Sequence, residues 1–130
     1  MKRVAARYGI ELPEWENARE EMRRVLITQA QEGQPTSYSE LVNRVRTIRL
    51  EPESYALAAM LGEISEEEDA LGRGMLTVLV VHKHGDPMPG QGFFDLAKKL
   101  GRDVSDRERC WIEESRRVLD VWSRNRPPRP

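Results

Sequence analysis

Residues 75–94, MLTVLVVHKHGDPMPGQGFF, decide the fold, because they begin with a nearly continuous apolar run and then break at a polar turn rich in Gly and Pro. The run over residues 75–82 is enriched in β-branched side chains and predicts a strand buried on both faces. A strand needs a partner. The nearest one is a hairpin through residues 84–86 with a return over 88–92, although Pro87 and Pro89 each remove a backbone donor from that pairing.

Helical patterns lie on both sides of this strand. Apolar residues recur at helical spacing over residues 13–32, 38–46, 53–70, 93–100 and 106–123. Two short capped helices followed by a hairpin-like strand is the order of a winged helix. We therefore predict a mainly α protein with a small β element (α+β), winged-helix-like, with about five helices around one short strand or hairpin. Residues 13–123 form its single domain, between a flexible arm (1–12) and a disordered basic tail (124–130).

The composition limits the class of protein. A chain of 130 residues, 38% hydrophobic and 33% charged, fits one domain with one modest core. Its formal net charge of −1 produces no global attraction to nucleic acid or to an anionic membrane. No apolar run approaches the ~20 residues that span a bilayer, and the N-terminal sequence lacks the apolar segment of a signal peptide. The single cysteine, Cys110, excludes an internal disulfide. We therefore expect a cytoplasmic protein.

Part of the chain resembles the winged-helix DNA-binding domain of the alkylguanine-DNA alkyltransferase family. The resemblance covers residues 36–86 and rests on Ser37-Tyr38-Ser39-Glu40-Leu41, on Leu57-Ala58-Ala59-Met60-Leu61 and on a strand that ends near a Gly-Asp turn. It implies a DNA-binding shape. The catalytic cysteine of that family is missing, because residues 76–82 contain none and Cys110 lies far downstream. Alkyl transfer to a cysteine at that strand is therefore excluded.

A second resemblance extends over residues 36–122. It is carried by Tyr38-Ser39-Glu40-Leu41, Leu61-Gly62-Glu63-Ile64-Ser65, Gly72-Arg73-Gly74-Met75-Leu76 and Pro89-Gly90-Gln91-Gly92-Phe93-Phe94, followed by a last helix that bears tryptophan. This pattern is similar to that of a group of small bacterial proteins. The group has no established activity, so the resemblance implies none.

The candidate nucleic-acid-binding residues are polar or cationic side chains at helix starts, at a helix end and on the turn after the strand. Serines at helix starts can bond phosphates, a tyrosine can stack on a base, and cations contact phosphates. Ordinary alternatives stay open, since the arginines suit the negative end of a helix dipole and the tyrosine can pack at the core edge. The candidates are Tyr38, Ser39, Arg44, Arg46, Arg49, Ser54, Lys83 and His84.

A second set of residues would form a polar pocket. Glu40, Glu63 and Asp95 lie beside apolar helix faces, which suggests a buried carboxylate trio, with surface or capping roles as the alternative. His82 and His84 would share one face of the strand, next to Asp86, but no third ligand has a standard spacing, so we expect no metal and no cofactor. The turn at residues 89–92 either cradles an anion or docks the two phenylalanines that follow it.

Three functions fit these patterns. The first is a nucleic-acid-associated, winged-helix-like binding protein with DNA as its partner. The alternatives are a protein-interaction or regulatory subunit that binds no nucleic acid, and a small enzyme with a site near Glu63, His82 and His84; on balance we do not expect an enzyme. The acidic run at residues 66–69 argues against the first function, since carboxylates repel phosphates, although this run lies at the far end of its helix. The sequence leaves the oligomeric state open.

Overall fold

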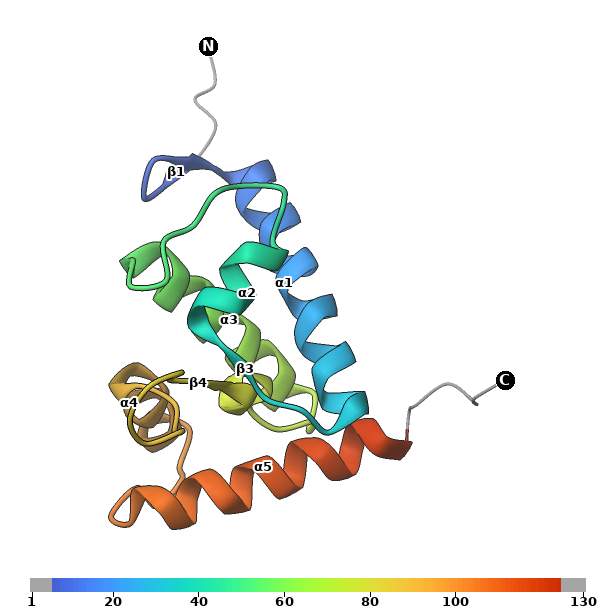
Figure 1. Ribbon diagram of the computed structural model, residues 1–130, viewed down its shortest axis with the longest axis vertical. Coiled ribbons are helices and arrows are strands. Elements are labelled where there is room, and N and C mark those ends of the chain that lie inside the picture. The colour runs from blue at the N-terminus through green and yellow to red at the C-terminus, as the bar shows by residue number, and fades with distance from the viewer. Residues whose placement is uncertain (1–5, 125–130) are drawn as a thin grey trace.

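The computed structural model describes residues 6–124. Its helices are α1 (Leu12–Glu32), α2 (Tyr38–Arg44), α3 (Tyr55–Ala70), α4 (Gln91–Lys99) and α5 (Arg107–Arg124) (Figure 1). Two short strand pairs complete the described part of the chain, so the prediction of a mainly helical protein with a small β element is confirmed. α5 lies across one end of α1 (Figure 1). Across residues 6–124, no helix is both long enough and apolar enough to cross a bilayer.

α1 forms where the sequence predicts it. Trp15, Ala18, Met22 and Leu26 recur at helical spacing and are fully buried. Such a stripe drives an amphipathic helix against a core. A proline in the first turn costs no intrahelical bond, because the first N–H groups of a helix have no partner in any case. Gly33 ends the helix with a φ of 68°, a left-handed conformation in which glycine avoids the steric cost of a Cβ.

The strand predicted over residues 75–82 is wrong for its first half. Leu76–Leu79 form a 3₁₀ helix, η1, and only Val80–Val81 are extended, as β4. Residues 75–81 are all buried, as predicted, because η1 packs against α1, α3 and α5. The Thr77 hydroxyl lies 2.6 Å from the Ser65 hydroxyl on α3, which also accepts from the Thr77 N–H at 3.2 Å. The Thr77 N–H is thus bonded to a side chain of α3, whereas in a strand it would bond to the backbone of a neighbouring strand.

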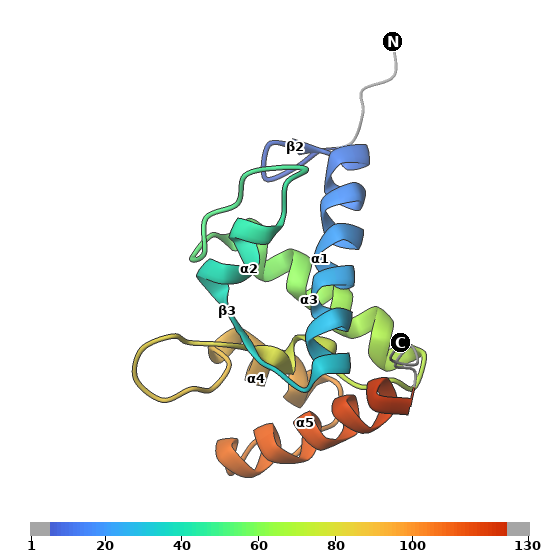
Figure 2. The ribbon, with the colours of Figure 1, turned by 45° about the vertical axis from the view of Figure 1, so that its right-hand side comes forward.

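The partner of β4 also differs from the prediction. β4 pairs in parallel with β3 (Thr36–Ser37), whose first residue lies opposite Val80. The predicted hairpin with a return over residues 88–92 is therefore wrong. Residues 82–90 form a loop that projects from the helices (Figure 2), and the His82 N–H donates to the Met88 carbonyl at 3.1 Å. The winged-helix-like arrangement is not confirmed, since its antiparallel wing is replaced by this loop.

The N-terminal segment is more ordered than predicted. β1 (Ala6–Arg7) and β2 (Ile10–Glu11) form an antiparallel hairpin within the segment expected to be a flexible arm. Tyr8 at its turn stacks on Trp15 of α1, with 6.0 Å between ring centroids. The rest of the predicted arm, residues 1–5, lies outside the described residues, as do residues 125–130 of the predicted tail, whereas Arg124 belongs to α5.

A buried ion-pair cluster joins α5 to the core. Glu114 on α5 is 2% exposed and accepts hydrogen bonds from the Met75 N–H at 2.8 Å and from the Arg102 guanidinium at 2.9 Å. Arg102 also donates to Asp69 near the end of α3 at 2.6 Å. The two carboxylates raise the pKa of Arg102. Because Met75 directly precedes η1, its bond to Glu114 fixes the start of the buried segment 75–81.

Candidate functional site

A cavity of about 550 Å³ lies where the starts of α2, α3 and α4 meet the loop after β4. Its apolar lining comes from α3 and α4, and its polar lining comes from the other segments. The structure thereby brings together residues from both sets predicted from the sequence. The apolar residues include Leu57, Leu61, Phe93 and Leu96, and the polar ones include Tyr38, Ser39, Ser54, His82 and Lys83.

Tyr38, the first residue of α2, joins three parts of the cavity wall. Its hydroxyl accepts a hydrogen bond from the Gly90 N–H at 2.8 Å, and its ring centroid lies 5.2 Å from that of His82. Burial raises the pKa of the Tyr38 hydroxyl, and the bond from Gly90 offsets this only in part. The hydroxyl therefore keeps its proton at neutral pH. Because it already accepts from Gly90, it can donate that proton's hydrogen bond to an acceptor atom in the cavity.

Gly90 is required by close contact and not by backbone conformation. Its φ of −74° is open to any residue. An added Cβ would lie 3.2 Å from the Tyr38 hydroxyl and 3.3 Å from His82 Nε2. Phe93 and Phe94 enter the core directly after this turn. The arrangement agrees with the docking alternative for residues 89–92.

The serines of the cavity hold helix starts. The Ser37 hydroxyl accepts from the Glu40 N–H at 3.1 Å, and the Ser54 hydroxyl accepts from the Leu57 N–H at 3.2 Å. The Ser39 hydroxyl lies 3.3 Å from that of Ser37. Ser37 and Ser54 are therefore N-caps of α2 and α3, which satisfy backbone donors that the helices leave unpaired.

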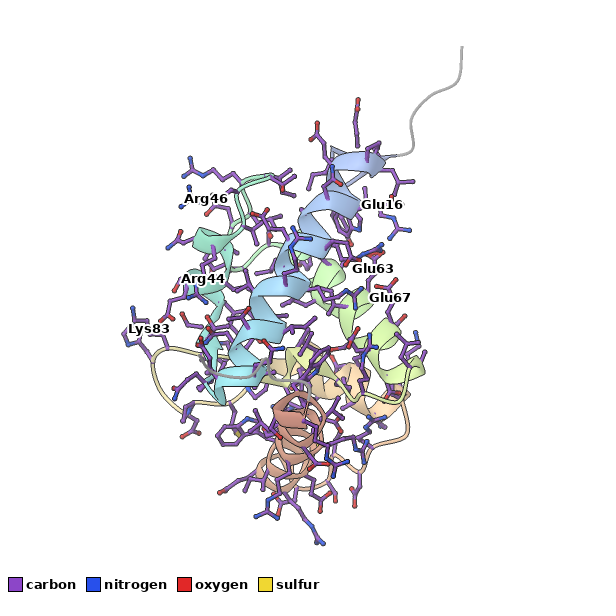
Figure 3. All side chains as sticks on the ribbon, turned by 90° about the vertical axis from the view of Figure 1, so that its right-hand side faces the viewer. Glu16, Arg44, Arg46, Glu63, Glu67 and Lys83 are labelled. Atoms are coloured by element: carbon purple, nitrogen blue, oxygen red, sulfur yellow. The ribbon has the colours of Figure 1, made fainter. Side chains whose placement is uncertain are left out.

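Cationic side chains lie near the site. Arg44, Arg46 and Lys83 lie on one side of the molecule, and Glu63 and Glu67 lie on the opposite side (Figure 3). Exposed carboxylates lie on the same segments as these cations: Glu40 on α2, Asp86 on the loop and Glu53 in the cavity lining. A nearly neutral protein contacts an anion through individual cations placed at the site.

The arginines predicted to bind nucleic acid differ in their contacts and in their exposure to solvent. The Arg44 guanidinium donates to the Gln29 side chain on α1 at 2.9 Å, so it has a structural contact. Arg46 is exposed, and the Arg49 side chain is 93% exposed. The predicted His84 is exposed on the projecting loop, as is Lys83, and only Lys83 of these two lines the cavity.

The predicted carboxylate trio does not assemble. Glu63 lies outside the cavity lining, and it accepts from the Trp15 indole N–H at 2.7 Å and from the Arg7 guanidinium. Glu40 is exposed, and Asp95 is exposed and bonded to a neighbouring glutamine on α4 at 2.7 Å. The hypothesis of a buried trio is wrong, because the hairpin and α1 hold Glu63 on the far side of α3.

The two histidines also fail to share a strand face. Both follow β4, and His82 lines the cavity while His84 and Asp86 stand on the exposed loop. Within residues 6–124, no three His, Cys, Asp or Glu side chains gather where they would hold a metal ion. The polar side chains of the cavity lining are Tyr38, His82, Lys83, Glu53, Thr77 and the three serines.

Two small residues of α3 were not assigned to the site from the sequence. Ala58 and Gly62 line the cavity one helical turn apart, and a Cβ added to Gly62 would have no heavy atom within 4 Å. The small side chains at positions 56, 58 and 59 indicate a close approach to α3, but they do not say whether a protein segment or an open space faces them. Here the space opposite Ala58 and Gly62 is open.

Comparisons with protein-family models, with curated proteins and with solved structures find no match to this chain. The two resemblances noted in the sequence stay predictions. Function is therefore argued from the geometry of the cavity and its surroundings.

Proposed function

We propose that the protein binds single-stranded nucleic acid and holds one unpaired base in the 550 Å³ cavity. The observation that carries the proposal is the combination of an apolar cavity, two aromatic rings at its wall and an exposed cation at its rim. Pockets for small ligands measure roughly 300–1,000 Å³ and are mostly apolar with a few placed polar groups. The cavity has that size and that chemistry.

The lining suits the two chemical parts of a nucleotide. Leu57, Leu61 and Phe93 offer apolar contact to the faces of a base, and the Tyr38–His82 pair offers aromatic surface. Unpaired bases bind proteins by stacking on such rings and by hydrogen bonds at their edges. The Tyr38 hydroxyl supplies one donor for a base edge. Lys83 at the rim supplies a cation for the backbone.

The acidic run of α3 no longer opposes this function. Glu68 is fully buried and accepts from Arg23 at 2.7 Å and from Arg73 at 2.8 Å. Burial alone would raise the pKa of Glu68, but the two arginines outweigh burial and lower it. Glu67 is bonded to Arg23, and Asp69 is bonded to Arg102. These carboxylates are neutralised within the fold, and Glu67 lies on the side opposite Lys83 (Figure 3).

The other two functions gain less from the structure. An interaction subunit would be favoured by a continuous exposed apolar patch. Among residues 6–124 the exposed large apolar side chains come from the hairpin, both ends of α3 and α5, and the hairpin and α5 lie at opposite ends of the molecule (Figure 1). The enzyme hypothesis near Glu63, His82 and His84 loses its basis, because these side chains do not converge.

The test uses fluorescence anisotropy with a labelled single strand of about 12 nucleotides and with a duplex of the same sequence. Gly62→Leu fills the cavity from α3 and removes a helical glycine, so the variant is expected to fold at least as stably. It should bind the single strand at least tenfold more weakly. Ala70→Leu, at the exposed end of α3, is the matched control and should bind like the wild type.

Salt dependence gives a second readout. With about three phosphate contacts, the logarithm of the binding constant should fall against the logarithm of salt concentration with a slope of about −2. Lys83→Gln should reduce that slope, whereas Lys99→Gln on α4 should not. The proposal fails if the wild type binds no single strand at low salt, or if Gly62→Leu binds as tightly as the wild type.

A further inference from the structure

A second hollow adjoins the base cavity. It measures about 450 Å³ and lies between the end of α2 and the segment that leads to α3. It shares the lining residues Ser39 and Pro52 with the base cavity, so the two spaces are adjacent. Its lining includes Arg46 and Arg49, together with Glu51. A ligand that extends past Ser39 and Pro52 would reach from one space to the other.

The backbone of this hollow is held in place by a carboxylate on α1. Glu21 accepts from the Arg46 N–H at 3.0 Å, from the Thr47 N–H at 2.9 Å and from the Thr47 hydroxyl at 2.7 Å. Burial alone would raise the pKa of Glu21, but the bonds from Thr47 and Arg46 lower it overall. The backbone of the segment is thus fixed at Arg46, and the Arg46 side chain lines the hollow.

Both guanidinium groups are available to a ligand. Within residues 6–124, the Arg46 side chain has no hydrogen-bonded partner, since only its backbone N–H is engaged. The Arg49 side chain lies 3.7 Å from the Glu51 carboxylate, and both are largely exposed. An exposed ion pair is weak and screened by salt, so a phosphate can compete with Glu51 for Arg49.

We propose that the second hollow binds the phosphate that adjoins the base held in the first cavity. The inference rests on the proposed function. It adds that the smallest ligand to fill both spaces is a nucleotide and not a nucleoside. Guanidinium groups bind phosphate oxygens through paired, charge-assisted hydrogen bonds. The linings of the two spaces differ accordingly: the first cavity is mostly apolar and binds the base, and the second hollow contains two arginines and binds the phosphate.

The experiment compares nucleosides with nucleotides on the full chain. The four nucleosides, their 5′- and 3′-monophosphates and inorganic phosphate are titrated into ¹⁵N-labelled protein, with chemical shifts as the readout. Monophosphates should bind at least tenfold more tightly than the matching nucleosides. Inorganic phosphate alone should shift the amides of residues 46–51. The preferred position of the phosphate, 5′ or 3′, then gives the direction of the strand.

Variants assign the effect to the second hollow. Arg46→Gln and Arg49→Gln should each weaken the monophosphates about fivefold to tenfold and leave the nucleosides unchanged. Each should reduce the salt slope for a single strand by about 0.7. Arg109→Gln is the matched control, because Arg109 is also a largely exposed arginine and lies 3.0 Å from a glutamate on α5. All three substitutions are at exposed positions, so thermal unfolding should match the wild type.

The outcomes separate this inference from the proposed function. If single strands bind, Gly62→Leu blocks them and the arginine variants bind monophosphates like the wild type, the phosphate site is wrong and the base cavity stands. If nucleosides bind as tightly as monophosphates, the phosphate site is also wrong. If neither single strands nor monophosphates bind, both proposals are wrong.

Discussion

Replacing Glu114 by glutamine tests how the buried segment is anchored. The carboxylate is 2% exposed and accepts from the Met75 N–H at 2.8 Å and from Arg102 at 2.9 and 3.1 Å. A glutamine has the same shape but only one acceptor oxygen, so its NH₂ group must face a donor. Hydrogen bonds to charged groups contribute about 1.5–3 kcal/mol, and removing one partner of a buried ion pair costs about 3–5 kcal/mol.

We therefore expect Glu114→Gln to lower the free energy of unfolding by about 3 kcal/mol and the melting temperature by about 10 °C. The assay is urea unfolding followed by circular dichroism, together with a thermal scan. Glu113→Gln is the control, because the Glu113 side chain is 62% exposed and its pair with Arg109 contributes less than about 0.5 kcal/mol. If the two variants unfold within about 0.5 kcal/mol of each other, the reasoning about the cluster is refuted.

Three further perturbations follow from the structure. Tyr38→Phe removes the acceptor of a backbone N–H and should cost about 1–2 kcal/mol by urea unfolding, whereas Tyr55→Phe, at an 83% exposed position, should change nothing; equal effects would contradict the hydrogen bond. The pKa of Glu21 in the folded protein lies below its ordinary value of 4.5, so the contribution of Glu21 to the free energy of unfolding is complete above that pH and is lost as the pH falls through the folded value. Glu21→Gln should therefore destabilise the protein at pH 7 and much less near pH 3. A difference in urea midpoint that stays constant with pH would contradict this. Gly74→Ala should cost at least about 1 kcal/mol more than Gly72→Ala, since both have positive φ but only at Gly74 would the new Cβ lie 3.0 Å from a carboxylate oxygen; equal costs would disprove the close packing.

The helices were predictable because their signals are local. The stripe on α1, the N-caps Ser37 and Ser54, and Gly33 after α1 are all read within a few residues of the element that they define. Local chemistry was insufficient at α5, because Ser105 and Asp106 are both residue types that cap helices. There the Asp106 carboxylate accepts from the Arg109 N–H at 3.1 Å, and the two candidates are adjacent in the sequence.

The central segment was only partly predictable. A short apolar run indicates burial on every side, but it does not distinguish a strand from a tight helical turn. The choice at Thr77 depends on Ser65, and the pairing of β4 depends on Thr36, which lies 44 positions before Val80. A two-residue strand has no periodicity of its own, so its partner cannot be found from a pattern.

The site was predictable only where local signals mark its residues. Tyr38, Ser39, Ser54 and Lys83 were selected as polar residues at helix starts and on a turn, and they line one cavity. Glu63 was grouped with them because it lies beside an apolar face of its helix. Its actual partners, which include Arg7, come from the N-terminal hairpin, and nothing near Glu63 in the sequence points to that segment.

The most direct test of the central claim is a map of amide chemical shifts when a short single-stranded oligonucleotide is added to ¹⁵N-labelled protein. If an unpaired base enters the cavity, the largest shifts should fall on Ser54, Gly62, Lys83 and Gly90, with α5 unchanged. Shifts confined to α5 or to the N-terminal hairpin, or no shifts at all at low salt, would contradict the claim.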